Sequence, residues 1–412
     1  MEIRPIFSAL LRSKTAPLLV ALQIAISLAV LANALYIVNL RVEAASRPSG
    51  IAEEANVFTL HAQPVKRPSH NELVAMQKQE TALLRAIPGV KSVAWTWAMP
   101  MSRSGTSTGI AVSKNQTETN ASAAMYFTPD SFVHTMGLKL LEGREFNAGE
   151  VVEVDANDAG NGDFPRSVIV TQALAKKLFP DATSYVGKTI SFGTGADSSE
   201  PRIVGVVERF QAHHASAREN GEFSVILPTR LTERFSRYAV RTEAGQRDRV
   251  MAQAEEAIRK ASPVPLIISS RTTEQDRLER YRNEKSMAWM LAVVSVLLLM
   301  VTASGIVGMT VLRVSQRKKQ IGIRRALGGR RANIVQYFLT ENVMISTAGV
   351  VAGCILALAL NKLLVSKLEL SQVDPMYLAY GAVAFWMLGA LTVLGPVIRA
   401  ARIAPSIATR SV

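Results

Sequence analysis

Few residues in this chain have the types and spacing that chemistry on a nucleotide requires. Gly187-Lys188-Thr189 matches the end of the pattern GxxxxGK[ST], in which backbone N–H groups of a glycine-rich loop hold phosphates. The first glycine of that pattern would fall at position 182, where Ala182 stands, so we reject a phosphate-binding loop here. Since the pattern occurs nowhere else in the sequence, we do not expect this chain to hydrolyse a nucleoside triphosphate.

Metal and hydrolytic sites have no better support in the sequence. The five histidines are His61, His70, His134, His213 and His214. None belongs to an HExxH motif or to a His/carboxylate cluster at ligand spacing, and no CxxC motif occurs. We interpret the adjacent pair His213-His214 as a chance surface pair, and the residues Ser104-Gly105-Thr106-Ser107 as a loop with no base at fixed spacing. We predict no catalytic site, no metal and no cofactor.

The strongest signal is a run of cations between two apolar stretches. It contains Arg313, Arg317, Lys318, Lys319, Arg324, Arg325, Arg330 and Arg331, with no acid before Glu341. Each Lys or Arg at the centre of a bilayer costs about 2.5–3.5 kcal/mol, so this segment cannot enter lipid and is predicted to stay in the cytoplasm. The net charge of +14 is concentrated here and near the two ends of the chain, so it indicates topology.

Within this segment, Ile323, Ala326 and Leu327 share one face at helical spacing. Ile334, Val335 and Phe338 continue an apolar side beyond Gly328-Gly329. A basic amphipathic helix on anionic lipid would gain about 1 kcal/mol per cation. A nucleic-acid surface is disfavoured, because the segment lies between membrane spans and has few aromatic residues. The residues alone leave a lipid surface and a docking helix for a cytoplasmic protein as the two alternatives.

Four apolar stretches set the topology, since about 20 apolar residues cross a bilayer as a helix. They are residues 17–39, 287–312, 341–365 and 377–398. The first exceeds the 7–15 apolar residues of a signal peptide and is predicted to be an uncleaved anchor. The segments predicted in the cytoplasm are residues 1–16, 313–340 and 399–412, and those predicted on the other side are residues 40–286 and 366–376.

Small residues recur in these stretches and are expected where helix backbones approach closely. They are Ser304, Gly305, Gly308, Gly349, Gly353, Gly381, Gly389 and Gly395. They indicate packing within the chain or, alternatively, a face between two copies. The single cysteine, Cys354, lies in an apolar stretch and can form no disulfide within the chain.

The large segment 40–286 has two similar halves. Strand-like residues 57–60 and 90–97 flank a helical pattern over 70–87, and strands at 238–242 and 265–268 flank a second one over 247–261. Between the halves, residues 98–230 are predicted to form short strands with loops. The fold class predicted is therefore an α+β membrane protein. It has four transmembrane helices and a large α/β domain, two split βαβ halves plus a β-rich insert, between the first and second helices.

Two stalks are predicted to carry this domain, a helix over 40–56 and a helix over 269–286. The second, SSRTTEQDRLERYRNEKS, is polar all round, which suits a stalk better than a core element. A plain solvated linker helix is the alternative. A continuous helix is stiff, so it would transmit displacement of a span to the soluble domain.

The cationic segment resembles the signature of the MacB/FtsX-type ABC permeases, whose usual form is a Glu followed by IGIRRALGA. Here it reads QIGIRRALGGRRANIVQYFLTEN, with Gln320 at the usual Glu and Gly329 where Ala is common. The soluble segment resembles the MacB-type periplasmic core domain through MYFTPDSFVHTMGLKLLEGREF, SVIVTQALAKKLFP, YVGKTISF and PRIVGVVERF, in the same order. The terminal PVIRAARIAPSIATR also resembles the family pattern. The resemblance covers nearly the whole chain.

The resemblance implies that residues 313–340 contain the coupling helix that seats in an ABC ATPase subunit. The docking residues it implies are Gln320, Ile321, Gly322, Ile323, Arg324, Arg325, Ala326, Leu327 and Gly328. The chain itself would bind no cofactor, and ATP and Mg would be used by the partner ATPase. Further partners implied are a second permease (identical or a paralogue), membrane lipid and, for some systems, a periplasmic adaptor with an outer-membrane channel. No nucleic acid is expected.

The function implied is that of a permease subunit in the bacterial inner membrane, with both termini cytoplasmic and a large periplasmic domain. It would couple ATP hydrolysis to a periplasmic conformational change by mechanotransmission, for export of peptides, antibiotics or other small molecules. The alternatives are a lipoprotein-releasing permease and a membrane sensor with a periplasmic ligand domain. The sequence does not identify the cargo.

Overall fold

The computed structural model describes residues 15–102, 104–156, 164–215, 219–328, 330–368 and 372–402, without the side chains of residues 219, 324, 325, 367 and 368. The chain forms two compact units. We call residues 43–284 the αβ unit, and we call the remainder, residues 1–42 with 285–412, the helical unit. Outside the described residues lie positions 1–14 and 403–412, which belong to the predicted cytoplasmic ends of the chain, and Glu369 of the predicted loop 366–376.

The first sheet of the αβ unit is built by two interleaved halves. Its strand order is β13 (Leu266–Thr272), β1 (Val57–Pro64), β12 (Ser236–Thr242), β2 (Val90–Trp95), and every neighbouring pair is antiparallel. β1 and β2 therefore run parallel and are joined by α3 (His70–Arg85), while β12 and β13 run parallel and are joined by α6 (Arg247–Ala261). Each half leaves a gap that a strand of the other half fills, which confirms the predicted split βαβ arrangement.

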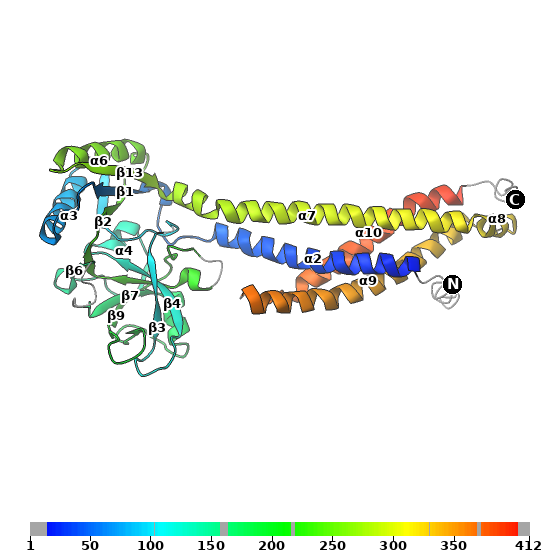
Figure 1. The fold of residues 1–412 in the computed structure, drawn as a ribbon, viewed down its shortest axis with the longest axis horizontal. Coiled ribbons are helices and arrows are strands. Elements are labelled where there is room, and N and C mark those ends of the chain that lie inside the picture. The colour runs from blue at the N-terminus through cyan, green and yellow to red at the C-terminus, as the bar shows by residue number, and fades with distance from the viewer. Residues whose placement is uncertain are drawn as a thin grey trace. The chain divides into compact units, whose positions relative to one another are not determined.

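One face of this sheet is covered by α3 and α6 (Figure 1). Alternate residues of β1, such as Phe58 and Leu60, pack there against Val250 and Ile258 of α6. α3 begins at a capping box, in which the Ser69 backbone N–H donates to Glu72 at 2.8 Å. The opposite face of the sheet, which carries Ala239, joins a second core together with residues of the insert.

The insert forms a seven-stranded mixed sheet. Its order is β5 (Leu140–Gly143), β9 (Arg202–Val207), β7 (Ser167–Thr171), β10 (Ser224–Leu227), β4 (Ala121–Phe127), β3 (Thr106–Ala111), β8 (Ser191–Phe192). A two-stranded sheet pairs β11 (Thr229–Thr232) with β6 (Val152–Asp155). The short helices are α4 (Phe132–Met136), α5 (Gln172–Leu178), η1 (Glu54–Asn56), η2 (Ala148–Glu150) and η3 (Glu219–Glu222). The β-rich insert is thus present, although Thr106 and Ser107, predicted in a loop, begin β3.

Four helices among the described residues are long and apolar enough to cross a membrane, and most of the length of each belongs to the helical unit. They are α2 (Thr15–Ser46), α7 (Thr273–Gln316), α9 (Arg331–Leu368) and α10 (Pro375–Ala401). α2 is the most buried of the four. Its Ser27 hydroxyl lies 2.9 Å from the Thr302 hydroxyl of α7, and Asn33 Nδ2 donates to Ala357 O of α9 at 3.2 Å. Such hydrogen bonds between apolar helices satisfy groups that lipid cannot.

The glycines separate into two groups. A Cβ on Gly349 would lie 2.8 Å from Ala21 O, and one on Gly353 would lie 2.9 Å from Leu28 Cδ2, so α2 and α9 touch at these two positions. Gly308 and Gly395 have open space around them. The first group supports the interpretation of close packing within the chain.

Two stalk predictions need correction. Residues 269–272 belong to β13, where they pair with β1, so the helix begins at Thr273. Nor is this helix exposed to solvent on every side, because the side chains of Asp276 and Tyr281 are buried within the αβ unit. The predicted helix over 40–56 ends at Ser46, and Glu54–Asn56 forms a separate short turn.

Candidate functional site

The predicted coupling segment 313–340 is divided by the structure into three parts. α7 continues to Gln316, the short helix α8 spans Lys318–Ala326, and α9 begins at Arg331. The Arg317 N–H, at the junction of α7 and α8, donates to Arg313 O at 3.1 Å. Gly328 lies two residues beyond the end of α8, and its φ of +89° is the left-handed conformation that closes helices at glycine. The predicted docking helix is therefore nine residues long.

A buried ion pair joins α7 to α9 close to the first residue of α8. Arg313, near the end of α7, pairs with Glu341 of α9, and their side chains are 9% and 3% exposed. A second cation, Arg317, places Nη1 at 3.7 Å from Glu341 Oε2. Taking two charges out of water is costly unless they are paired, so this pair holds the end of α7 against α9 about three turns after α9 begins.

Arg317 extends this cluster towards α8. Its Nη1 donates to the Tyr337 hydroxyl at 2.5 Å, and its guanidinium lies 5.4 Å from the centroid of the Tyr337 ring. Arg317, Tyr337 and Ile321 border a small pocket of about 40 Å³. α8 therefore faces α9 through Ile321, which packs against the core of the helical unit, and Gly322 beside it is buried.

The other side of α8 is exposed. Ile323 is 47% and Leu327 is 83% exposed, and Gln320 and Ala326 are exposed beside them. Apolar side chains presented on a cationic helix favour a partner surface. Four of the nine predicted docking residues have exposed side chains: Gln320, Ile323, Ala326 and Leu327. Two are not exposed, Ile321 and Gly322, and Gly328 lies beyond the end of the helix. The side chains of residues 324 and 325 lie outside those described.

The predicted continuous apolar side is wrong. Ile334 and Phe338 do not extend the face of Ile323 and Leu327, because they are buried in the core of the helical unit. Gly328 turns the chain between the two groups. The pairing of Arg313 with Glu341 was not predicted from the sequence. The available signal was one cation and one acid at the ends of two consecutive apolar stretches.

The rejected chemical motifs have structural roles or lie in unexpected places. Lys188 Nζ of the GKT tripeptide lies 5.1 Å from the centroid of the Phe179 ring, and Gly187 N–H donates to Ile203 O at 2.8 Å. His213 is buried, which corrects the predicted surface pair, and burial followed by the charge of His214 lowers its pKa to about 4. Across the described ranges, no group of three or more His, Cys, Asp or Glu residues could hold a metal ion.

Two family models match the chain. The MacB-like periplasmic core domain matches residues 19–261, and the FtsX-like permease C-terminal domain matches residues 292–405. The first match covers more than half of the 412 residues. Both matched domains are of the permease type.

Curated relatives agree with these matches. The macrolide export ATP-binding/permease protein MacB of Bradyrhizobium diazoefficiens is 28% identical over 262 residues, 61% of this chain and 37% of that protein. MacB of Agrobacterium fabrum is 25% identical over 241 residues, 56% of this chain and 34% of that protein. The pyoverdine export ATP-binding/permease protein PvdT of Pseudomonas savastanoi pv. phaseolicola is 34% identical over 131 residues, which are 32% of this chain and 20% of that protein. In these alignments the chain spans between about a fifth and two fifths of the relatives' length.

Among solved structures, the extracellular domain of the noncanonic ABC-type transporter YknZ from Gram-positive bacteria aligns with 52% of this chain and 99% of its own. The identity is 18% and the TM-score is 0.32, too low to carry an argument, so the fold rests on the strands and helices described above. The family matches confirm the resemblance found in the sequence. With four apolar helices and an αβ unit between the first two, the chain belongs to the ABC transporter permeases that combine a MacB-like periplasmic core domain with an FtsX-like permease domain, and it is a multi-pass membrane protein with a large extracellular domain.

Proposed function

We propose that this chain is the permease subunit of an inner-membrane ABC transporter, and that α8 docks the ATPase subunit, carried on a separate chain. The observation that carries this proposal is the exposure of Ile323 in the cationic helix α8 and of Leu327 directly after its last residue. Burying a Leu or Ile side chain contributes about 1.5–3 kcal/mol, so a partner that covers both gains a substantial part of its affinity there. ATP and Mg would be bound by the partner, and both termini of this chain would be cytoplasmic.

The work of the chain would be mechanical. α7 is one hydrogen-bonded helix from Thr273 to Gln316, and its last turns are bound to α9 through Arg313 and Glu341. A displacement of α8 by the ATPase would therefore move α7 and α9 together, and α7 would carry the displacement to the αβ unit. This is the mechanotransmission expected from the sequence resemblance.

We propose export of peptides, antibiotics or other small molecules, since relatives of this chain are named for macrolide and pyoverdine export. A second permease, identical or a paralogue, would complete the membrane part. A periplasmic adaptor and an outer-membrane channel would extend the route in envelopes that have two membranes.

The docking proposal is tested by co-purification of the chain with its ATPase in mild detergent, comparing wild type with Ile323→Asp and Leu327→Asp. Each variant places a carboxylate on the exposed face, so ATPase binding should weaken at least about tenfold, which corresponds to 1.4 kcal/mol. The matched control is Asn333→Asp, which adds the same charge at an exposed position near the start of α9 and should bind like wild type.

A parallel sedimentation assay with anionic vesicles separates the docking helix from a lipid-binding helix. For this readout the chain is held in zwitterionic nanodiscs. The proposal is refuted if both Asp variants bind the ATPase as wild type does and only their binding to anionic vesicles is weakened.

A further inference from the structure

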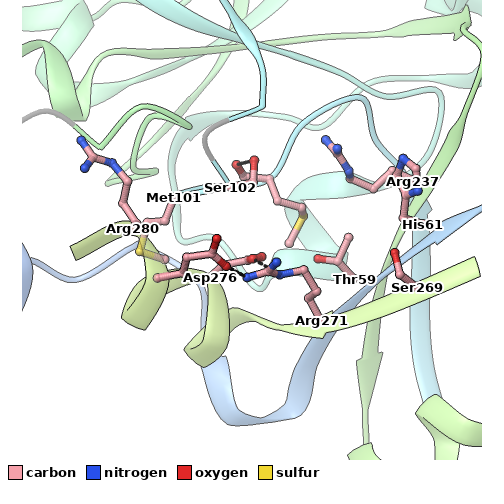
Figure 2. A pocket seen from close by; sticks show the side chains of 11 residues that line it. Thr59, His61, Met101, Ser102, Arg237, Ser269, Arg271, Asp276 and Arg280 are labelled. Atoms are coloured by element: carbon pink, nitrogen blue, oxygen red, sulfur yellow. Dashed lines mark hydrogen bonds and ion pairs between the residues drawn. The ribbon is translucent and has the colours of Figure 1, made fainter. Parts of the chain in front are cut away.

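The αβ unit contains a cavity of about 280 Å³ that the proposed ATPase coupling does not use. It lies on the side of the first sheet that α3 and α6 do not cover, and its wall includes the beginning of α7 (Figure 2). Residues of three neighbouring strands form its floor. Since all of these residues belong to the αβ unit, the cavity is complete within that unit.

The strand register explains why the floor is polar. Phe58 and Leu60 of β1 point to α6, so Thr59 and His61 point to the cavity. His61 stands opposite Ser269 of β13 on one side and Arg237 of β12 on the other. Polar side chains from sequence positions about 200 residues apart thus lie in one row across the three strands, and this row lines the cavity.

The two carboxylates at the cavity are already engaged. Asp276 Oδ1 accepts from Arg271 Nε at 2.8 Å, and Glu279 pairs with the same guanidinium. Figure 2 shows Arg271 and Asp276 joined to each other across one side of the cavity. Arg280, on the next part of the wall, donates from Nη2 to His214 O at 2.6 Å. These four side chains form the charged rim.

Arg237 differs from the other arginines at this cavity. It is buried, at 9% exposure, and its Nη atoms donate to two uncharged oxygens, Trp97 O at 2.5 Å and Ser104 Oγ at 3.3 Å. No carboxylate of the described residues forms an ion pair with it. Burial lowers the pKa of Arg237 to about 10, against the opposing charge of Asp276. A buried cation without an anion in contact is unfavourable, so the site is suited to receive one.

Two further polar groups lie beside Arg237 at the cavity. The Thr59 hydroxyl belongs to a side chain that is 6% exposed, and it has no hydrogen-bond partner in the described structure. His61 stacks on Phe235 with ring centroids 5.1 Å apart. Burial, followed by the charge of Arg237, lowers the pKa of His61, so the imidazole is neutral near pH 7 and keeps one N–H donor. A free hydroxyl and an imidazole N–H next to a buried guanidinium form a set of donors for an anion.

We propose that this cavity binds a small organic carboxylate, whose carboxylate group is held by Arg237 and Thr59 and whose apolar part contacts Met99 and Met101. The two methionines line the same cavity and offer flexible apolar surface. At about 30 Å³ per water molecule, the volume equals roughly nine waters, which admits a molecule of about eight heavy atoms. The site stands whether or not α8 docks an ATPase.

Hexanoate is the probe, and saturation-transfer NMR on the purified full chain in detergent is the measurement. We expect hexanoate to bind with a dissociation constant of about 1 mM or tighter. Hexanamide, which has the same shape without the charge, should bind at least about tenfold more weakly. Inorganic phosphate should also bind more weakly than hexanoate, because it leaves Met99 and Met101 without contact.

Thr59→Val is the decisive variant, because it keeps the shape of the side chain and removes the hydroxyl. We expect it to weaken hexanoate binding at least about tenfold, as should Arg237→Gln. Thr229→Val is the matched control, since the Thr229 hydroxyl is equally buried and unpartnered but lies outside this cavity. The proposal is overturned if hexanoate does not bind, if hexanamide or phosphate binds as well as hexanoate, or if Thr59→Val binds like Thr229→Val.

Discussion

The buried pair of Arg313 with Glu341 gives the sharpest prediction for the helical unit. Glu341→Gln removes the negative charge and nearly preserves the shape of the side chain. Arg313 is then left as a buried cation, with Arg317 as a second cation nearby. Removing one partner of a buried ion pair costs about 3–5 kcal/mol, and we expect a loss in this range for Glu341→Gln. Arg313→Met should cost somewhat less, because Arg317 remains near the orphaned carboxylate at 3.7 Å.

The double variant tests whether the cost comes from the unpaired charge. Arg313→Met with Glu341→Leu replaces the pair by apolar side chains of similar volume, and such replacements are neutral or stabilising by about 1–4 kcal/mol. We therefore expect the double variant to unfold at or above the temperature of wild type. The two single changes should be strongly non-additive.

Cys354 supplies the assay. It is the single cysteine of the sequence and lies partly buried in α9, so a thiol-reactive dye reports the unfolding of the helical unit. Gln336→Ala, at an exposed position of the same helix, is the control and should stay within about 0.5 kcal/mol of wild type. The reasoning fails if Glu341→Gln unfolds like Gln336→Ala, or if the double variant is as unstable as the sum of the single variants.

Two further predictions concern packing and pH. Gly349→Ala or Gly353→Ala should destabilise the helical unit by about 1–3 kcal/mol, because the added Cβ meets α2. Gly395→Ala is the control and should be neutral or slightly stabilising, because its Cβ would lie in open space. The Cys354 assay measures the stability of all three variants. Burial raises the pKa of Glu80 from 4.5 to about 7, so the folded αβ unit holds this proton more tightly than the unfolded chain. Its contribution is complete below about pH 4.5 and is lost as the pH rises through about 7, a change of about 3 kcal/mol. Glu80→Gln should remove this part of the pH dependence in thermal unfolding followed by tryptophan fluorescence, and an unchanged pH profile would contradict the assignment.

The arrangement of the first sheet could be predicted because its signals are local. Alternating apolar residues in β1 and the helical pattern of α6 are visible in short windows of sequence. Two strand–helix–strand segments at opposite ends of a soluble region also point to one sheet, since neither half can bury its apolar face alone. The start of the stalk could not be found in this way, because Ser269 to Thr272 are polar and enter β13 only through pairing with β1.

The cavity could not be predicted from the sequence, for a different reason. His61, Arg237 and Ser269 come from three strands, and their row depends on a register that no local pattern contains. Thr59 has no unusual neighbours in the sequence, and its importance lies in the absence of a hydrogen-bond partner within the described residues. The burial of His213 is likewise a consequence of tertiary packing and has no local signature.

The coupling segment shows how a correct family resemblance still leaves the mechanics open. Arg313 is one of the eight cations of the segment, yet its side chain is buried, because it pairs with Glu341 of α9. Arg317 then donates a hydrogen bond to Tyr337, so the residue between α7 and α8 is attached to α9 as well as to α7. Under the proposed function, a force on Leu327 reaches both long helices through Arg317. The buried pair would make them respond together, so its loss should weaken coupling even where the ATPase still binds.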